Sequence, residues 1–152
     1  MIRPARTDEY RAMTTSTLTE PVTTVQRLYA AFGARDQAAV LALLDEDVDW
    51  GLEVSAPGAE LVPMLHNGRG HDAVRAYFAG VAQLEMLAFE PARFLTDGRT
   101  VLVQLRIHVR HPGTGKDVDM DEIHRWEVGE DGRIVQYRPY TDTAGLIDIY
   151  RV

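Results

Sequence analysis

Two titratable side chains, Glu122 and His124, stand two positions apart in a segment that otherwise alternates apolar and polar residues. In a β-strand, residues two apart point to the same face, so we expect the carboxylate and the imidazole to be neighbours. An imidazole changes its protonation near neutral pH, and an adjacent carboxylate can orient or charge it. The pair therefore predicts general acid/base chemistry, with His124 and Glu122 as the candidate catalytic residues.

The face on which this pair lies follows from a β-hairpin predicted over residues 100–128. Closing the hairpin at residues 112–115 places Arg106, His108 and Arg110 opposite Asp121, Asp119 and Asp117, respectively, on one face. The opposite face is apolar, and a slip of one residue would destroy both patterns. In this register Glu122 lies opposite Leu105 and His124 opposite Val103, so both titratable groups point toward apolar neighbours. We expect the charged face to be solvated or to lie at a dimer contact.

Glu122 and His124 have two interpretations on such a face. In the first, Glu122 pairs with His124 or with an arginine inside the core, and the pair is purely structural. In the second, both line a ligand cavity, because titratable groups in apolar surroundings often mark a functional site. The aromatic residues likewise either pack in the core or form a slot for a flat hydrophobic ligand.

A ligand in such a slot would contact large apolar side chains on several predicted elements. The inward orientation of one of them, Tyr137, requires that the turn at residues 130–132 closes without a bulge, and Gly129 makes a bulge possible. The predicted ligand-contacting residues are Tyr29, Trp50, Tyr77, Val103, Leu105, Met120, Trp126 and Tyr137.

The elements that position these residues follow from periodicity and turn signals. Apolar residues recur at three- and four-residue steps from Leu18 to Phe32, which predicts a helix ending near Gly33. Asp36 is the expected N-cap of a short second helix, and a third helix carries Val74, Tyr77, Phe78, Val81 and Leu84 on its buried side. We expect strands at about 48–52, 86–95, 100–111, 117–128 and 133–140, and a loop over 54–70. The segment 143–150 is left unassigned.

Composition limits the classes of function. The chain has 152 residues, about one domain, and we divide it into an N-terminal extension, 1–16, and a domain, 17–152. The formal net charge of −7 opposes nucleic-acid binding. The chain has no cysteine, no apolar run of membrane-spanning length and no secretory signal, so we expect a cytoplasmic protein without a membrane partner. We expect no metal and no cofactor, since His108 and His111 fall on opposite faces of their strand and no phosphate-binding glycine motif is present.

Short sequence segments in each predicted element carry a family pattern: Val25–Phe32, Asp36, Asp47–Trp50, Gly68–Gly70, Ala73, Val74, Phe78, Ile123–Trp126, Asp131–Val135 and Tyr140–Asp142. With these residues, the predicted order of elements resembles the SnoaL-like family of the nuclear transport factor 2-like superfamily, over about residues 20–148. This resemblance implies an α+β fold in which a cone-shaped, curved antiparallel sheet is wrapped by three helices. It also implies an apolar cavity at the open end and a homodimer formed through the sheet.

The resemblance also assigns family positions to particular residues. His124 matches the histidine of SnoaL-like polyketide cyclases, but the acid/base aspartate expected after Arg138 is replaced by Pro139. The catalytic tyrosine and the general-base aspartate of ketosteroid isomerases correspond to Leu28 and to about Leu52 in this sequence. The isomerase residues are therefore absent, unless the neighbouring Tyr29 or Glu53 takes over a role. We therefore expect binding of a small, apolar, cyclic or carbonyl-bearing molecule, with cofactor-free isomerase, cyclase or hydrolase activity as one outcome. The alternative is a non-catalytic ligand-binding or dimerisation module of the same fold.

Overall fold

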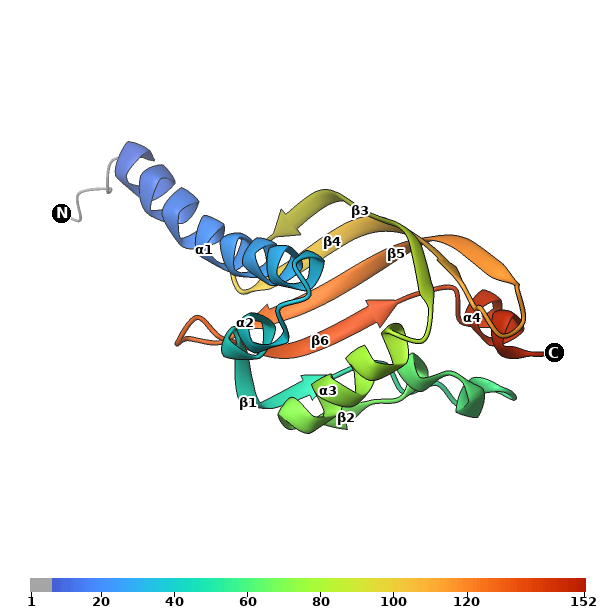
Figure 1. Cartoon of the computed structure of the whole chain (residues 1–152). Coiled ribbons are helices and arrows are strands. Elements are labelled where there is room, and N and C mark those ends of the chain that lie inside the picture. Colours follow the sequence, from blue (N-terminus) through green and yellow to red (C-terminus); the bar gives the residue numbers. More distant parts are fainter. Residues whose placement is uncertain (1–6) are drawn as a thin grey trace.

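A curved six-stranded sheet forms the centre of the protein, as the computed structural model in Figure 1 shows. The structure describes residues 7–152, with side chains from residue 20 onward. The strands follow the order β2-β1-β6-β5-β4-β3 across the sheet. The elements along the chain are α1 (Thr7–Gly33), α2 (Gln37–Ala42), β1 (Leu44–Trp50), η1 (Ala59–Leu61), η2 (Pro63–Leu65), β2 (Gly68–Arg69), α3 (Gly70–Val81), β3 (Glu85–Thr96), β4 (Thr100–Arg110), β5 (Asp117–Val128), β6 (Ile134–Tyr140) and α4 (Thr143–Tyr150).

The helices agree with the sequence predictions at most of their ends. Helix α1 ends at Gly33 as predicted, and the side chain of Asp36 caps α2 by accepting a hydrogen bond from the Ala39 amide at 3.0 Å. Helix α1 begins at Thr7, so residues 7–16 are helical although their sequence is aperiodic. Residues 1–6 and the side chain of Leu18 lie outside the described part, and the division of the chain at residue 17 stays a prediction.

The β4–β5 hairpin has the predicted register along its whole length. Arg110 pairs with Asp117, Leu105 with Glu122 and Val103 with His124. Burial alternates strictly along β4, because odd-numbered residues face the helices and even-numbered residues face outward. On the outward face the ion pairs run diagonally, with Arg106 contacting Asp119. These pairs are well exposed and contribute little to stability.

The other end of the sheet differs from a simple meander. Strand β1 runs parallel to β6, and the two-residue strand β2 pairs antiparallel with β1. Strand β2 lies in the segment predicted to be a loop. Helix α4, in the segment that the sequence left unassigned, starts at the N-cap Asp142 and lies beside the β4–β5 turn in Figure 1.

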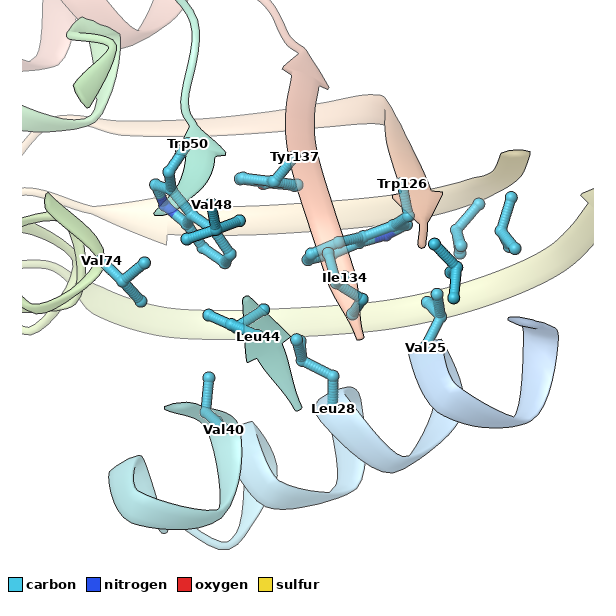
Figure 2. Close-up of a cluster of buried hydrophobic side chains, with 13 residues drawn as sticks. Val25, Leu28, Val40, Leu44, Val48, Trp50, Val74, Trp126, Ile134 and Tyr137 are labelled. Carbon is cyan, nitrogen blue, oxygen red and sulfur yellow. The ribbon is translucent and has the colours of Figure 1, made fainter. Parts of the chain in front are cut away.

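The interior contains two clusters of buried apolar side chains, one at each end of the curved sheet. The first joins α1, α2 and the sheet, and Figure 2 shows Val25 and Leu28 of α1 together with Trp126 and Ile134. The second joins η1, η2, α4 and the half of the β4–β5 hairpin that lies nearer its turn. Strand β5 spans both clusters, with Met120 in the second and Trp126 in the first. The two buried polar residues between them on this strand are Glu122 and His124.

Candidate functional site

Glu122 and His124 point into the interior, as the hairpin register predicts. Their residues are 7% and 5% exposed, and they are surrounded by apolar side chains. The Nε2 atom of His124 lies 2.9 Å from Oε2 of Glu122. Both members of the pair therefore satisfy part of their hydrogen-bonding capacity within the protein. This hydrogen bond offsets part of the free-energy cost of burying two polar groups.

Three further side chains extend this pair into a chain of hydrogen bonds. The hydroxyl of Tyr29, on α1, lies 2.8 Å from Nδ1 of His124. Nε1 of Trp126 donates to the Tyr29 oxygen at 3.1 Å. At the other end, the hydroxyl of Thr141, just after β6, donates to Oε1 of Glu122 at 2.5 Å. The chain thus connects α1, β5 and the segment that leads into α4.

The directions of these hydrogen bonds follow from which atoms can donate. The indole N–H of Trp126 can only donate, and an ionised Glu122 can only accept. A neutral His124 then donates from Nε2 to Glu122, so its Nδ1 accepts from the Tyr29 hydroxyl. With this tautomer every polar atom in the chain has a partner.

Burial keeps the tyrosine hydroxyls of this region protonated. Removal from water raises the pKa of Tyr29 well above its usual range, and the nearby charge of Glu122 adds to the effect. The pKa values of Tyr77 and Tyr137 are raised for the same leading reason. All three phenols therefore remain hydrogen-bond donors at any physiological pH.

A cavity of about 90 Å³ lies against this chain of hydrogen bonds. Its wall includes Tyr29, Glu122, His124, Trp126, Pro139 and Thr141, and the rest is largely aromatic and aliphatic. Met86, at the start of β3, also lines the cavity and is 39% exposed, so the cavity reaches the surface there. The volume is of the same order as that of engineered apolar cavities that hold one benzene ring, so the cavity has room for about one ring.

Six of the eight predicted ligand-contacting residues line this cavity. Tyr137 is among them although a bulge follows the turn, because Val128 pairs with Ile134 and Glu127 with Gln136, which leaves Val135 as an extra residue in β6. The extra residue lets both Ile134 and Tyr137 point inward, three positions apart. Val103 and Leu105 point inward but are packed in the two clusters and do not line the cavity. The six that line it are Tyr29, Trp50, Tyr77, Met120, Trp126 and Tyr137.

The sequence did not indicate the role of Thr141. A signal was present in the register, because His124 pairs with Pro139 and the position opposite Glu122 is therefore occupied by residue 141. Cavity-lining side chains from other elements were also missed, since periodicity does not tell which buried residue faces an opening. They are Leu28, Phe32, Met64, Leu65, Phe78, Val81, Leu84, Met86, Phe89, Ile107, Val109 and Leu146.

Only some of the residues considered for the catalytic positions of related enzymes lie at the cavity. Pro139 lines the cavity opposite His124, so no carboxylate stands at that position. Glu53 is exposed and accepts a hydrogen bond from the Asn67 amide at 3.1 Å, outside the cavity wall. Leu52 does not line the cavity either, whereas Tyr29 does. Of the two substitutes considered, only Tyr29 reaches the site.

A second polar cluster lies on the other face of the sheet. Asp49 accepts hydrogen bonds from Arg138, Gln136 and Asn67. Partial burial would raise the pKa of Asp49, but these three donors outweigh it and lower that pKa to about 2. The cluster ties β1 to β6 and to the segment before β2, and none of its members lines the cavity. Its geometry indicates a structural role.

Neither a metal cluster nor a membrane span is found in the part of the chain that the structure describes. Among its described side chains, no three His, Asp or Glu residues are grouped closely enough to hold a metal ion. No described helix combines the length and the hydropathy needed to cross a bilayer.

Residues 25–137 match the family model of the SnoaL-like domain, so the chain belongs to this family. A protein of nuclear transport factor 2-like fold and unknown function from Burkholderia pseudomallei is 29% identical, with a TM-score of 0.75, over 88% of this chain and 98% of that one. A second such protein, from Burkholderia xenovorans, is 26% identical, with a TM-score of 0.76 and the same coverage.

TerC, crystallised with polyporic acid, is 22% identical, with a TM-score of 0.72, over 86% of this chain and 98% of its own, and this likeness shows the fold alone. No curated protein matches the chain significantly. The predicted family and fold class are thereby confirmed.

Proposed function

We propose that this SnoaL-like protein binds a small, largely apolar, cyclic ligand in its cavity and moves a proton on it by cofactor-free acid/base chemistry. The observation that carries the proposal is the continuous chain of hydrogen bonds from Trp126 through Tyr29 and His124 to Glu122 along the cavity wall. Such a chain holds an imidazole in one tautomer beside a carboxylate, in surroundings from which water is largely excluded.

The proton would move through Tyr29 to His124. The Tyr29 oxygen has two lone pairs, of which one accepts the Trp126 N–H, so the other is open to a ligand proton. As the C–H bond next to a ligand carbonyl breaks, its proton passes to the Tyr29 oxygen and the tyrosine's own proton passes to Nδ1 of His124. The electron pair of that bond moves toward the carbonyl oxygen and forms an enolate. Glu122 stabilises the imidazolium, and return of the proton to the same or another carbon completes an exchange or an isomerisation.

A non-catalytic ligand-binding protein is the second candidate, and two observations favour it. Pro139 stands where related enzymes place a carboxylate, and both ring nitrogens of His124 already have protein partners. In this case the Glu122–His124 pair would only hold the wall of the cavity together.

Exchange of the protons next to the carbonyl of cyclohexanone, followed by NMR in D₂O, distinguishes the two candidates. We expect the protein to accelerate this exchange and His124→Gln to lower the rate by about 10²-fold or more. His108→Gln is the matched control, because His108 lies on the outer face, paired with Asp117, and should keep the rate. A folded His124→Gln variant with an unchanged rate would remove the acid/base proposal. Binding without exchange by the wild type would leave the non-catalytic candidate.

We also propose that the protein forms a homodimer through the outer face of the sheet. Leu95, Ile123 and Tyr140 are 53%, 37% and 49% exposed on this face. Ile123 and Tyr140 are direct neighbours across β5 and β6, so they form a continuous apolar surface. Light scattering should give twice the monomer mass, and Ile123→Asp should shift the protein to monomers. A monomeric wild type at high micromolar concentration would contradict this proposal.

A further inference from the structure

Three phenylalanine side chains from three different elements meet at the edge of the cavity. Phe32 is on α1, Phe78 on α3 and Phe89 on β3. The ring centroid of Phe32 lies 5.6 Å from that of Phe78 and 5.2 Å from that of Phe89, so Phe32 joins the other two. All three residues line the cavity, and all three are only partly buried. Side chains with both properties lie where a cavity meets the surface, and we call these three residues the phenylalanine rim.

The phenylalanine rim spans a space that the backbone leaves open. Helix α3 has little direct backbone contact with either α1 or β3 in the part of the chain that the structure describes. Phe32 and Phe78 pack against the first buried cluster, whereas Phe89 packs against the second. Met86, which marks the opening of the cavity, precedes Phe89 on β3. The width of the opening on this side is therefore set by side chains rather than by the backbone.

The phenylalanine rim also adjoins the proton-transfer chain. The ring of Phe89 packs edge-to-face against that of Tyr29, with centroids 5.6 Å apart, and the Tyr29 hydroxyl contacts His124. A ligand that touches the Tyr29 hydroxyl therefore lies beside Phe89. Because the cavity has a volume of only about 90 Å³, a second fused ring would meet the phenyl rings of the rim. Forcing extra carbon atoms into well-packed side chains is costly.

We infer that the phenylalanine rim forms the entrance to the cavity and limits the ligand to a single ring. This inference rests on the proposed function and deepens it by naming the size class of the ligand and the residues that set it. Rotation of a partly exposed side chain needs no movement of the backbone, so a single ring can pass. A larger ligand is excluded because the rim occupies the space that its second ring needs.

Two neutral ketones of different size test the inference: cyclohexanone, with one ring, and 2-decalone, with two fused rings. Hydrophobic transfer alone would favour 2-decalone by about 10²-fold, because it has four more carbons to bury. We expect the wild type to show the opposite preference in NMR titrations and to bind cyclohexanone about 10-fold more tightly or better, since the second ring cannot enter without displacing packed side chains. This comparison needs no variant and so does not depend on the folding of one.

Variants of the phenylalanine rim should reverse the preference. Phe32→Ala and Phe89→Ala should each tighten 2-decalone binding by about 10-fold or more, because the second ring then finds space to be buried. Each should weaken cyclohexanone binding by no more than about 3-fold, and Phe32→Leu and Phe89→Leu, which perturb packing less, should shift the preference in the same direction. Phe94→Ala is the matched control, because Phe94 is also partly buried on β3 and packs near Tyr29 but does not line the cavity.

The outcomes separate this inference from the proposed function. Tighter binding of 2-decalone than of cyclohexanone by the wild type would overturn the inference while leaving the cavity a binding site. Folded Phe32→Ala and Phe89→Ala variants that keep the wild-type preference, or an equal shift in Phe94→Ala, would do the same. Failure of both ketones to bind the wild type would instead overturn the proposed function.

Discussion

Nε2 of His124 lies 2.9 Å from Oε2 of Glu122, two residues earlier on the same strand, and both side chains are about 7% exposed. On the outer face, His108 and Asp117 form a shorter contact of 2.6 Å but are substantially exposed. This difference in burial determines how strongly the stability of the protein depends on each pair. The outer pair is screened by water, whereas the inner pair has lost its hydration and depends on its partners.

This dependence predicts a strongly non-additive response to mutation. His124→Leu leaves the Glu122 carboxylate buried with Thr141 as its remaining donor, and we expect it to lower the free energy of unfolding by about 3 kcal/mol or more. The double variant Glu122→Met/His124→Leu replaces the pair by apolar side chains and should recover at least about 1 kcal/mol of that loss. Urea unfolding of the two single variants and the double variant measures the coupling. If the losses of the two single variants add up to the loss of the double variant, Glu122 and His124 are not energetically coupled, and this prediction is wrong.

Removing the Tyr29 hydroxyl tests the link between Trp126 and His124. Tyr29→Phe deprives both of a partner, and we expect a loss of about 1–3 kcal/mol in the free energy of unfolding. Ketone proton exchange should slow by about 10-fold or more because the relay is interrupted. Tyr150→Phe is the matched control, since the buried Tyr150 hydroxyl has no partner among the residues that the structure describes, and its removal should not destabilise the protein. An unchanged exchange rate in folded Tyr29→Phe would show that the tyrosine is not part of the relay.

In the proposed mechanism Thr141 is a positioning residue, because its hydroxyl contacts Glu122, which in turn contacts His124. Thr141→Val removes the hydroxyl but keeps the shape, and it should shift the pH profile of ketone exchange with a change in rate of less than about 10-fold. Thr141→Ser restores the donor and should restore the pH profile. A profile that Thr141→Val leaves in place would assign Thr141 a purely structural role.

The Asp49 cluster predicts a pH dependence of stability that is separate from the cavity. The pKa of Asp49 is lowered from 3.8 to about 2 in the folded protein, so the unfolded chain takes up its proton first as the pH falls. The stabilising contribution is therefore complete above about pH 4 and is lost as the pH falls toward 2. Asp49→Asn should cost about 1–2 kcal/mol at pH 7 and progressively less below pH 4.

Asp47→Asn, at an exposed position on the same strand, is the control for this pH dependence. It should change the free energy of unfolding little at any pH. Urea unfolding between pH 7 and pH 2 compares the two variants with the wild type. A cost of Asp49→Asn that stays constant over this range would exclude the cluster as its source.

The sequence predicted those parts of the fold that depend on interactions between residues close together in the chain. The register of β4 against β5 was predictable residue by residue, because a charged face and an apolar face both constrain it. The parallel pairing of β1 with β6 was not, since no local signal connects strands so distant in the sequence. The helical start of α1 at Thr7 has no amphipathic pattern to mark it.

The alternation of inward and outward residues along the strands predicted which side chains of the site point inward, but not which of them reach the cavity. Val103 and Leu105 share the inward face with Trp126, yet only Trp126 reaches the cavity. Whether an inward residue lines the cavity or packs beneath a covering helix depends on tertiary packing that a single strand does not encode. The partnership of Tyr29 with His124 was hidden for the same reason, because it joins α1 to β5 across 95 positions.

The place of β6 between β1 and β5 has a consequence for how the protein assembles. Strand β6, one of the two middle strands of the sheet, follows all the others in the sequence, so β1 acquires its partner on that side only after most of the chain has been synthesised. The hairpin of β4 and β5 involves only nearby residues and is available earlier as a template. Closure of the cavity is therefore a late event, and chains cut short before Ile134 would expose its aromatic lining.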